Sequence, residues 1–230
     1  MNKAYSIFQK RVFNCKKCPR LVSFKKKITK DKRKSFSNET YWGKPVTGYG
    51  DLNAKIVLIG LAPAAHGATR TGRVFTGDKS SDFLFKCLHK SGLSNQSFSN
   101  YRNDNLKLKN TYITLALKCV PPQDKPTSNE LKNCSKIFDT ELKFLKKKKI
   151  IIALGKIAFD ACIKFYKDNY KLSGKFTFGH NVQYKIGDIV LLGCYHPSPR
   201  NVNTKRIDIP KMVSLFKKAV SLAEKQRIPN

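Results

Sequence analysis

Four short runs of apolar residues occur along the chain, separated by segments in which apolar residues recur at helical spacing. Each run is long enough for a strand that is buried on both faces, and the four cover residues 55–60, 111–117, 150–155 and 188–195. Helical spacing covers residues 80–91, 128–146, 156–166 and 210–225. Buried strands that alternate with helices are typical of a parallel sheet covered on both faces. The pattern predicts a three-layer α/β/α sandwich with a central, mainly parallel four-stranded sheet.

The whole chain, residues 1–230, is expected to form a single domain. This length suits one sizeable core, and no internal repeat or long linker divides the sequence. Residues 1–50 are predicted to be a basic and irregular segment. The lysine-rich run at 25–38 within it is typical of a solvated face or a mobile loop, with direct phosphate contact as the alternative.

Two loops that follow predicted strands contain the candidate catalytic side chains. The first, Gly60–Asp78, is rich in Gly, Ala and Pro, which leave little bulk between the backbone and a ligand. Its larger or polar side chains are His66, Arg70, Arg73, Phe75 and Asp78. The second loop, His196–Asn201, places a histidine between a strand and two prolines. Because the carboxyl ends of parallel strands meet at one edge of a sheet, we expect the two loops to lie together.

The net charge of the chain indicates a class of partner. The chain has 46 Lys and Arg against 15 Asp and Glu, a formal net charge of +31. This excess favours binding to polyanions, and DNA, RNA and anionic membranes all fit. An AT-rich genome is an alternative source of part of the lysine excess. No apolar run reaches the 18 residues of a membrane span, so no spanning segment is predicted, and DNA rather than a membrane is the expected partner.

The cysteines indicate a metal centre. Cys15 and Cys18 form a C-x2-C pair, and Cys119 and Cys134 form a second, more widely spaced pair. Four thiolates suffice for a zinc ion or a [4Fe–4S] cluster, and the composition does not distinguish the two. The remaining three lie among apolar residues and are expected to be ordinary buried cysteines: Cys87, Cys162 and Cys194. An odd total of seven favours a reducing cytosol.

Several separated motifs resemble the uracil-DNA glycosylase superfamily, and most closely its family 5, the type b enzymes. The resemblance covers nearly the whole chain, in the order Pro19–Val22, Tyr41–Val46, Gly48–Asp51, residues 60–83, Lys118–Pro122, Ala153–Gly155 and Tyr195–Asn201. The similar family 4 enzymes have an acidic residue directly after the first glycine of the first loop. Leu61 stands at that position here, which favours family 5.

The resemblance implies an activity and a cofactor. It implies a monofunctional DNA glycosylase that removes uracil, and other deaminated bases such as hypoxanthine and xanthine, from DNA and so initiates base excision repair. It also implies a structural [4Fe–4S] cluster and no catalytic metal. The ligands of that cluster would be Cys15, Cys18, Cys119 and Cys134.

Roles for the loop residues follow from the chemistry of base removal. A glycosylase must flip the base out of the stack, and negative charge then grows on the departing base. His196 is suited to hydrogen-bond the carbonyl oxygen of the base, as the family histidine does. Asp78 is the candidate for polarising the attacking water or stabilising the sugar cation, with a helix N-cap as the alternative. Phe75 is expected to stack on the flipped base, with core packing as the alternative.

The remaining site predictions concern base and DNA contacts. Ala62 and Pro63 are expected to let the flipped nucleotide approach closely, and His66 to contact the nucleotide or water. Contacts with DNA are expected from Arg70 and Arg73 in the first loop and from Ser198, Pro199, Arg200 and Asn201 in the second. Asn201 also fits a simple turn residue.

Three positions depart from the family pattern. The stretch Ile113–Leu117 lacks the asparagine that related enzymes often use to read the base, which is consistent with loose specificity. Asp124 follows Pro121 and Pro122 where a neutral amide is usual. Lys205 stands where the family usually has glycine, so the backbone conformation of the family is not assured at this position.

Two other function classes are weighed against the glycosylase. A nucleic-acid-binding module with a degenerate site and a metal centre would explain the charge and the cysteines, but not the intact pair Asp78 and His196. A nuclease that uses a divalent metal needs clustered carboxylates, and the acidic residues here are scattered. The expected protein is a monomer in the cytoplasm of a prokaryotic cell, associated with the nucleoid.

Overall fold

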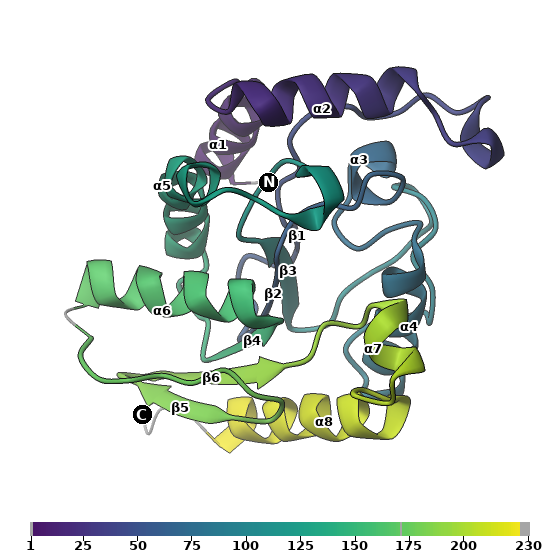
Figure 1. Ribbon diagram of the computed structural model, residues 1–230. Helices are drawn as coiled ribbons and strands as arrows, with labels where there is room; N and C mark the ends of the chain where they lie inside the picture. The colour runs from purple at the N-terminus through teal and green to yellow at the C-terminus, as the bar shows by residue number, and fades with distance from the viewer. Residues whose placement is uncertain (1, 171, 226–230) are drawn as a thin grey trace.

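A six-stranded sheet runs through the middle of the computed structural model, which describes residues 2–170 and 172–225 (Figure 1). Its order is β1-β3-β2-β4-β6-β5. Four parallel strands form its centre: β2 (Ile56–Gly60), β3 (Thr111–Leu115), β4 (Ile150–Leu154) and β6 (Ile189–Cys194). These are the four predicted strands. Their side chains are buried throughout, as continuous apolar runs require.

The prediction of four strands is wrong in number, because two short antiparallel strands extend the sheet at its edges. These are β1 (Tyr49–Gly50), which pairs with β3, and β5 (Gln183–Ile186), which pairs with β6. β1 has only two residues, and β5 is mostly exposed or half-buried. Neither strand therefore produces an apolar run in the sequence.

Helices cover both faces of the sheet and confirm the three layers (Figure 1). On one face, α4 (Lys79–Lys90) and α8 (Ile209–Lys225) pack against alternate side chains of the central strands. On the other face, the opposite side chains contact α1 (Lys3–Phe13), α5 (Ser128–Phe144) and α6 (Lys156–Tyr170). Because successive strand residues point to opposite faces, each central strand contributes to both cores.

The N-terminal segment is more regular than its composition indicates. Besides α1, it contains α2 (Pro19–Lys30) and a 3₁₀ turn at Lys34–Phe36. The buried residues Tyr5, Phe8 and Val12 form an apolar stripe at helical spacing, which fixes α1 against the sheet. The prediction of an irregular segment is therefore wrong, since a narrow apolar stripe suffices to dock a highly charged helix.

A buried ion pair connects β3 to α5. Lys118 and Glu141 are 1% and 0% exposed and contact each other directly. The Glu141 carboxylate also accepts hydrogen bonds from the Tyr112 hydroxyl at 3.1 Å and the Gly48 backbone N–H at 2.7 Å. Lys118 Nζ donates to Thr114 Oγ1 at 2.8 Å. Both charges are thus paired and hydrogen-bonded, which a buried ion pair requires.

Three shorter helices complete the described part of the chain. They are α3 (Ala68–Thr71) in the first loop, α7 (Pro199–Asn203) in the second, and a 3₁₀ turn at Pro122–Asp124. None of the helices in residues 2–170 and 172–225 is both long enough and apolar enough to cross a membrane.

Candidate active site

The two predicted loops meet at one edge of the sheet, around a cavity of 370 Å³. The cavity lies beyond the carboxyl ends of β2, β3 and β6, which is where open α/β sheets place their ligands. Six of its lining residues were singled out in the sequence: Ala62, Phe75, Asp78, His196, Ser198 and Pro199. Five others were not assigned to the site: Leu61, Ala64, Ser80, Leu115 and Asp124.

Asp78 lines this cavity and also caps helix α4. Its Oδ1 accepts a hydrogen bond from the Ser81 backbone N–H at 2.9 Å, and its own N–H donates to Ser81 Oγ at 3.1 Å. The N-cap expected as an alternative is therefore present. Burial raises the pKa of the Asp78 carboxyl, against the lowering effect of these backbone hydrogen bonds.

Space for the second carboxylate oxygen of Asp78 is provided by Gly67. A Cβ atom at Gly67 would lie 2.1 Å from Asp78 Oδ2 and 2.9 Å from its Cγ. No real side chain tolerates such a contact, so only glycine lets the carboxylate occupy its present position. At Gly67, therefore, glycine is required for a steric reason.

His196 follows β6 and is held by its own loop. Its backbone carbonyl accepts hydrogen bonds from the Asn201 side-chain amide at 2.9 Å and from the Ser198 N–H at 2.8 Å. Burial lowers the pKa of the imidazole to about 4, because the surroundings disfavour its charged form. His196 is therefore neutral at pH 7 and able to act as a neutral hydrogen-bond donor.

The Phe75 ring forms one wall of the cavity beside His196. The two ring centroids lie 6.0 Å apart at 33°. Phe75 has a left-handed backbone with φ of 46°, which is rare for an aromatic residue and marks a constrained position. Its ring packs over Gly60, where a Cβ would lie 2.8 Å from Cζ. Phe75 is 7% exposed, so it belongs to the core and to the cavity wall at once.

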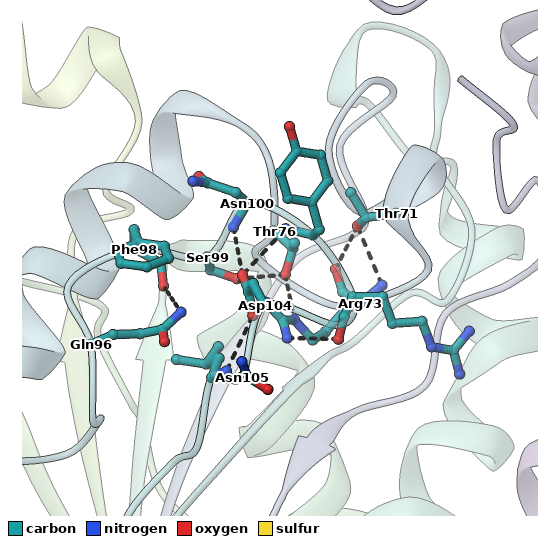
Figure 2. A network of polar contacts seen from close by, with 12 residues as sticks. Thr71, Arg73, Thr76, Gln96, Phe98, Ser99, Asn100, Asp104 and Asn105 are labelled. Carbon is teal, nitrogen blue, oxygen red and sulfur yellow. Dashed lines mark hydrogen bonds and ion pairs between the residues drawn. The ribbon is translucent and has the colours of Figure 1, made fainter. Parts of the chain in front are cut away.

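The expectation that Arg73 contacts DNA is wrong, because its side chain is 4% exposed and bound to protein acceptors. Arg70 is equally buried and paired, although it also lines a cavity of 560 Å³ beside the first loop. Arg70 pairs with Glu39 and donates to the carbonyls of His66 and Gly77. Arg73 reaches both carboxylate oxygens of Asp104 at 2.7 Å, as Figure 2 shows. Each arginine thus braces the first loop from inside the protein.

Arg73 is the centre of a wider polar network (Figure 2). Its guanidinium donates to Thr76 Oγ1 at 3.0 Å, to Ser99 Oγ at 2.9 Å and to the Arg102 carbonyl at 3.0 Å. The network joins the first loop to the segment 94–105, which runs alongside it. Apart from Thr76, these acceptors lie outside the first loop, so the loop depends on tertiary contacts for its shape.

His66 does not reach the 370 Å³ cavity and instead lines a neighbouring cavity of 560 Å³. Its Nδ1 is hydrogen-bonded to the Tyr41 hydroxyl at 2.8 Å. Burial, together with the charges of Arg33 and Arg70, lowers the pKa of the imidazole. Pro63 is buried and contributes to the shape of the loop rather than to the lining of the cavity.

The second loop turns into α7 directly after His196. Ser198 is the N-cap of this helix and accepts a hydrogen bond from the Asn201 N–H at 3.4 Å. Arg200 is exposed, whereas the Asn201 amide points to the His196 carbonyl. Lys205 adopts a φ of 55°, so the left-handed backbone is kept although the usual glycine is missing.

Asp124 brings a second carboxylate to the cavity. It lies in a tight turn in which Gln123 and Asp124 are both left-handed, with φ of 54° and 56°. Two successive strained residues of this kind are uncommon outside functional loops. The sequence had shown Asp124 only as a departure from the family pattern; the turn that aims it at the cavity is visible only in the fold.

The four predicted ligand cysteines gather around one small cavity. Cys15 and Cys18 come from the junction of α1 and α2, Cys119 follows β3, and Cys134 lies in α5. All four are free thiols, and burial raises the pKa of Cys119 to about 12 and that of Cys134 to about 11. The buried ammonium of Lys25 lies close to Cys119 and Cys15. This corrects the prediction that the whole run 25–38 is solvated.

Four thiols around one cavity provide the donor set of a [4Fe–4S] cluster. Within residues 2–170 and 172–225, no three Cys, His, Asp or Glu side chains are arranged to hold one metal ion. The same four thiols are also a possible donor set for zinc. Cys87, Cys162 and Cys194 are buried elsewhere in the core, as predicted.

Comparison with known proteins identifies the family. Residues 47–222 match the model of the uracil DNA glycosylase superfamily. The type-5 uracil-DNA glycosylase of Pyrobaculum aerophilum is 40% identical over 94% of this chain and 92% of its own. That of Thermus thermophilus is 40% identical over 91% and 94%. The type-4 enzyme of Thermotoga maritima is only 28% identical over 75% of this chain. The chain therefore belongs to the uracil-DNA glycosylase superfamily, and within it to the type-5 family.

Proposed function

We propose that this protein is a monofunctional glycosylase that flips uracil out of DNA and hydrolyses its N-glycosidic bond, the first step of base excision repair. The observation that carries the proposal is the cavity that joins Asp78, Phe75 and His196 at the sheet edge. The type-5 relatives, named for uracil excision, support the substrate. A net charge of +31 supports attraction to the phosphate backbone.

His196 stabilises the departing base in this proposal. Negative charge grows on the carbonyl oxygen of the base as the bond to the sugar breaks, and a neutral imidazole N–H donates to that oxygen. Because its pKa is lowered, His196 is not an imidazolium at neutral pH. It therefore stabilises the departing base by donating a hydrogen bond and not by transferring a proton. Asn201 fixes the His196 backbone, so its part is positioning rather than contact with DNA.

Asp78 acts on the sugar side of the same bond. As a carboxylate it polarises the attacking water and stabilises positive charge on the sugar. Its N-cap hydrogen bond holds one oxygen in place, and the space over Gly67 receives the other. Helix capping and catalysis are therefore compatible functions of one carboxylate.

The range of bases that we propose as substrates is based on the absence of side-chain amides from the cavity lining. Among the described residues that line it, none has an amide side chain. Hydrogen bonds from side-chain amides are a common way to discriminate one base edge from another. We therefore extend the proposal to hypoxanthine and xanthine, whose carbonyl oxygens His196 is equally able to stabilise.

A structural [4Fe–4S] cluster held by Cys15, Cys18, Cys119 and Cys134 is part of the proposal. When bound, such a cluster links the α1–α2 junction to β3 and α5 through four covalent Fe–S bonds. No catalytic metal is proposed. The protein is further proposed to act as a monomer in the cytoplasm of a prokaryotic cell, near the nucleoid.

The central prediction concerns base release. Asp78→Asn and His196→Asn are each expected to slow release of uracil by about a hundredfold or more, because each removes stabilisation of the transition state. The measurement uses end-labelled DNA with one uracil opposite guanine, without added metal, followed by alkali cleavage. DNA binding should remain. The matched controls are Asp160→Asn and His89→Asn, which change exposed residues on α6 and α4.

Two results of this assay would contradict the proposal. Intact DNA with uracil, hypoxanthine and xanthine substrates alike would favour a binding module without activity. Strand breaks that need a divalent metal and no alkali would indicate a nuclease.

A second prediction concerns pH. The single-turnover rate should show no step near pH 6.5, because burial has moved the pKa of His196 down to about 4. The rate should fall at acidic pH, as Asp78 is protonated above its ordinary pKa of 3.8 and His196 is protonated near 4. A step near pH 6.5 that disappears in His196→Asn, but not in His89→Asn, would show that His196 titrates normally.

Stability should follow pH in a related way. The unfolded His196 binds a proton below about pH 6.5, whereas the folded one does so only near 4. This contribution to the free energy of unfolding is therefore complete above pH 6.5 and decreases as the pH falls towards 4. Denaturant unfolding of the parent protein and of His196→Asn across this range isolates the contribution.

A third prediction tests the steric role of Gly67. Gly67→Ala should displace the Asp78 carboxylate, lower the rate of base release by about a hundredfold and weaken the α4 cap by about 1 kcal/mol. The control is Gly92→Asn, since Gly92 has open space around it and asparagine tolerates its left-handed backbone. Full activity in Gly67→Ala would show that Asp78 needs no such packing.

The cluster generates a fourth prediction. Protein purified without oxygen should be brown, with about four irons per chain, and Cys→Ser at each proposed ligand should lower the iron content. Cys87→Ser serves as the control, because Cys87 is buried in a different part of the core. A colourless preparation with stoichiometric zinc and no iron would overturn the cluster.

A further inference from the structure

A second cavity opens beside the proposed base cavity. It measures 560 Å³ and shares Ala64, Asp78 and Ser80 with the 370 Å³ cavity. The two spaces are therefore in direct contact, with the candidate catalytic carboxylate on the boundary between them. The mechanism proposed above uses only the smaller cavity, and leaves the larger one without a ligand.

One wall of the larger cavity presents an exposed aromatic ring. Tyr101 lines this cavity and is 61% exposed, so its ring is accessible to a ligand. Its backbone is nevertheless fixed. Asp104 Oδ2 accepts hydrogen bonds from the N–H groups of Asn100 at 2.8 Å and Tyr101 at 3.2 Å, and Asp104 is itself held by the buried Arg73.

This support extends to the catalytic loop. The Gly77 N–H, one residue before Asp78, donates to the Ser99 carbonyl at 2.7 Å. The Arg73 network of Figure 2 ties the same two segments together through side chains. Tyr101 is thus carried by a segment whose backbone is held at a fixed position relative to Asp78. Aromatic rings beside a nucleic-acid site are the platforms on which unpaired bases stack.

Positive charge is present on the rims of the same cavity. Arg33 is exposed on one rim, and Lys79 is 85% exposed on another. Asp82 offsets Lys79 in part, since their charged atoms lie 3.9 Å apart. Arg33 is therefore the cation best placed to meet a phosphate there.

We propose that the larger cavity binds the nucleotide next to the flipped one on the same strand, with Tyr101 stacked on its base and Arg33 on its phosphate. This inference rests on the proposed function, since it requires a flipped nucleotide in the smaller cavity. Chain continuity supports it, because the strand that places one nucleotide in the smaller cavity continues with its neighbours close by, and the two cavities share lining residues. An aromatic ring and a cation in the lining of one cavity match the two parts of a nucleotide.

The test compares single-stranded oligonucleotides that each contain one uracil. One is unmodified, and two others lack the base on the 5′ or the 3′ neighbour of uracil, where a tetrahydrofuran replaces the nucleotide sugar and base. The parent protein should lose about tenfold in kcat/KM on one of the two abasic oligonucleotides, the usual effect of one lost stacking contact. Tyr101→Ala should show that loss already on the unmodified oligonucleotide, and no further loss on the abasic one.

Two variants serve as controls. Tyr101→Phe retains the ring and should behave as the parent does. Tyr170→Ala removes a tyrosine on α6 that is 59% exposed and lies outside both cavities, so it should also leave the rates unchanged.

The phosphate contact is tested with an oligonucleotide that has a neutral methylphosphonate in place of the neighbouring phosphate. The parent protein should lose activity on this oligonucleotide. Arg33→Gln should release uracil from it as fast as from the unmodified one.

The outcomes separate this inference from the function on which it rests. Failure of the parent protein to release uracil from the unmodified oligonucleotide would reject the proposed function. Normal release with equal kcat/KM on all three oligonucleotides, or an unchanged tenfold loss in Tyr101→Ala, would reject the neighbouring-nucleotide site alone.

Discussion

Two buried guanidinium groups determine the shape of the loop on which the candidate site depends. Arg70 and Arg73 turn inwards and bind Glu39, Asp104 and several backbone carbonyls. A loop made largely of Gly, Ala and Pro has few side chains with which to hold itself together. Hydrogen bonds between charged groups are stronger than those between neutral groups. The two arginines therefore fix the backbone conformation of a loop whose small residues make few contacts of their own. The small residues in turn leave room for a ligand.

The low polarity of the site acts on both candidate catalytic groups. Burial raises the pKa of Asp78 and lowers that of His196, because in each case it favours the neutral form. For His196 this matches the need for a neutral donor. For Asp78 it is opposed by backbone hydrogen bonds at the start of α4, which stabilise the carboxylate. Helix capping is thus the structural feature that keeps a buried carboxylate available for chemistry.

The cysteine cavity and the sheet are coupled through neighbouring residues. Lys118, paired with Glu141 inside the protein, directly precedes Cys119, and its backbone N–H donates to Cys134 Sγ at 3.4 Å. The ion pair therefore fixes β3 and α5 relative to each other at the point where each contributes one thiol. The segment between α1 and α2 brings the other two, and the apolar stripe of α1 holds this segment against the core.

The sequence by itself determined the four central strands, the helices between them and the loops that contain Asp78 and His196. Strands buried on both faces need continuous apolar runs, and this requirement is local and visible. The sequence did not reveal the edge strands, whose side chains are largely exposed. It also did not reveal that the side chains of Arg70 and Arg73 are buried and paired. Each arginine has its carboxylate partner 31 residues away. Whether a charged side chain faces solvent or a buried partner depends on what the fold brings beside it, and only the tertiary structure decides that.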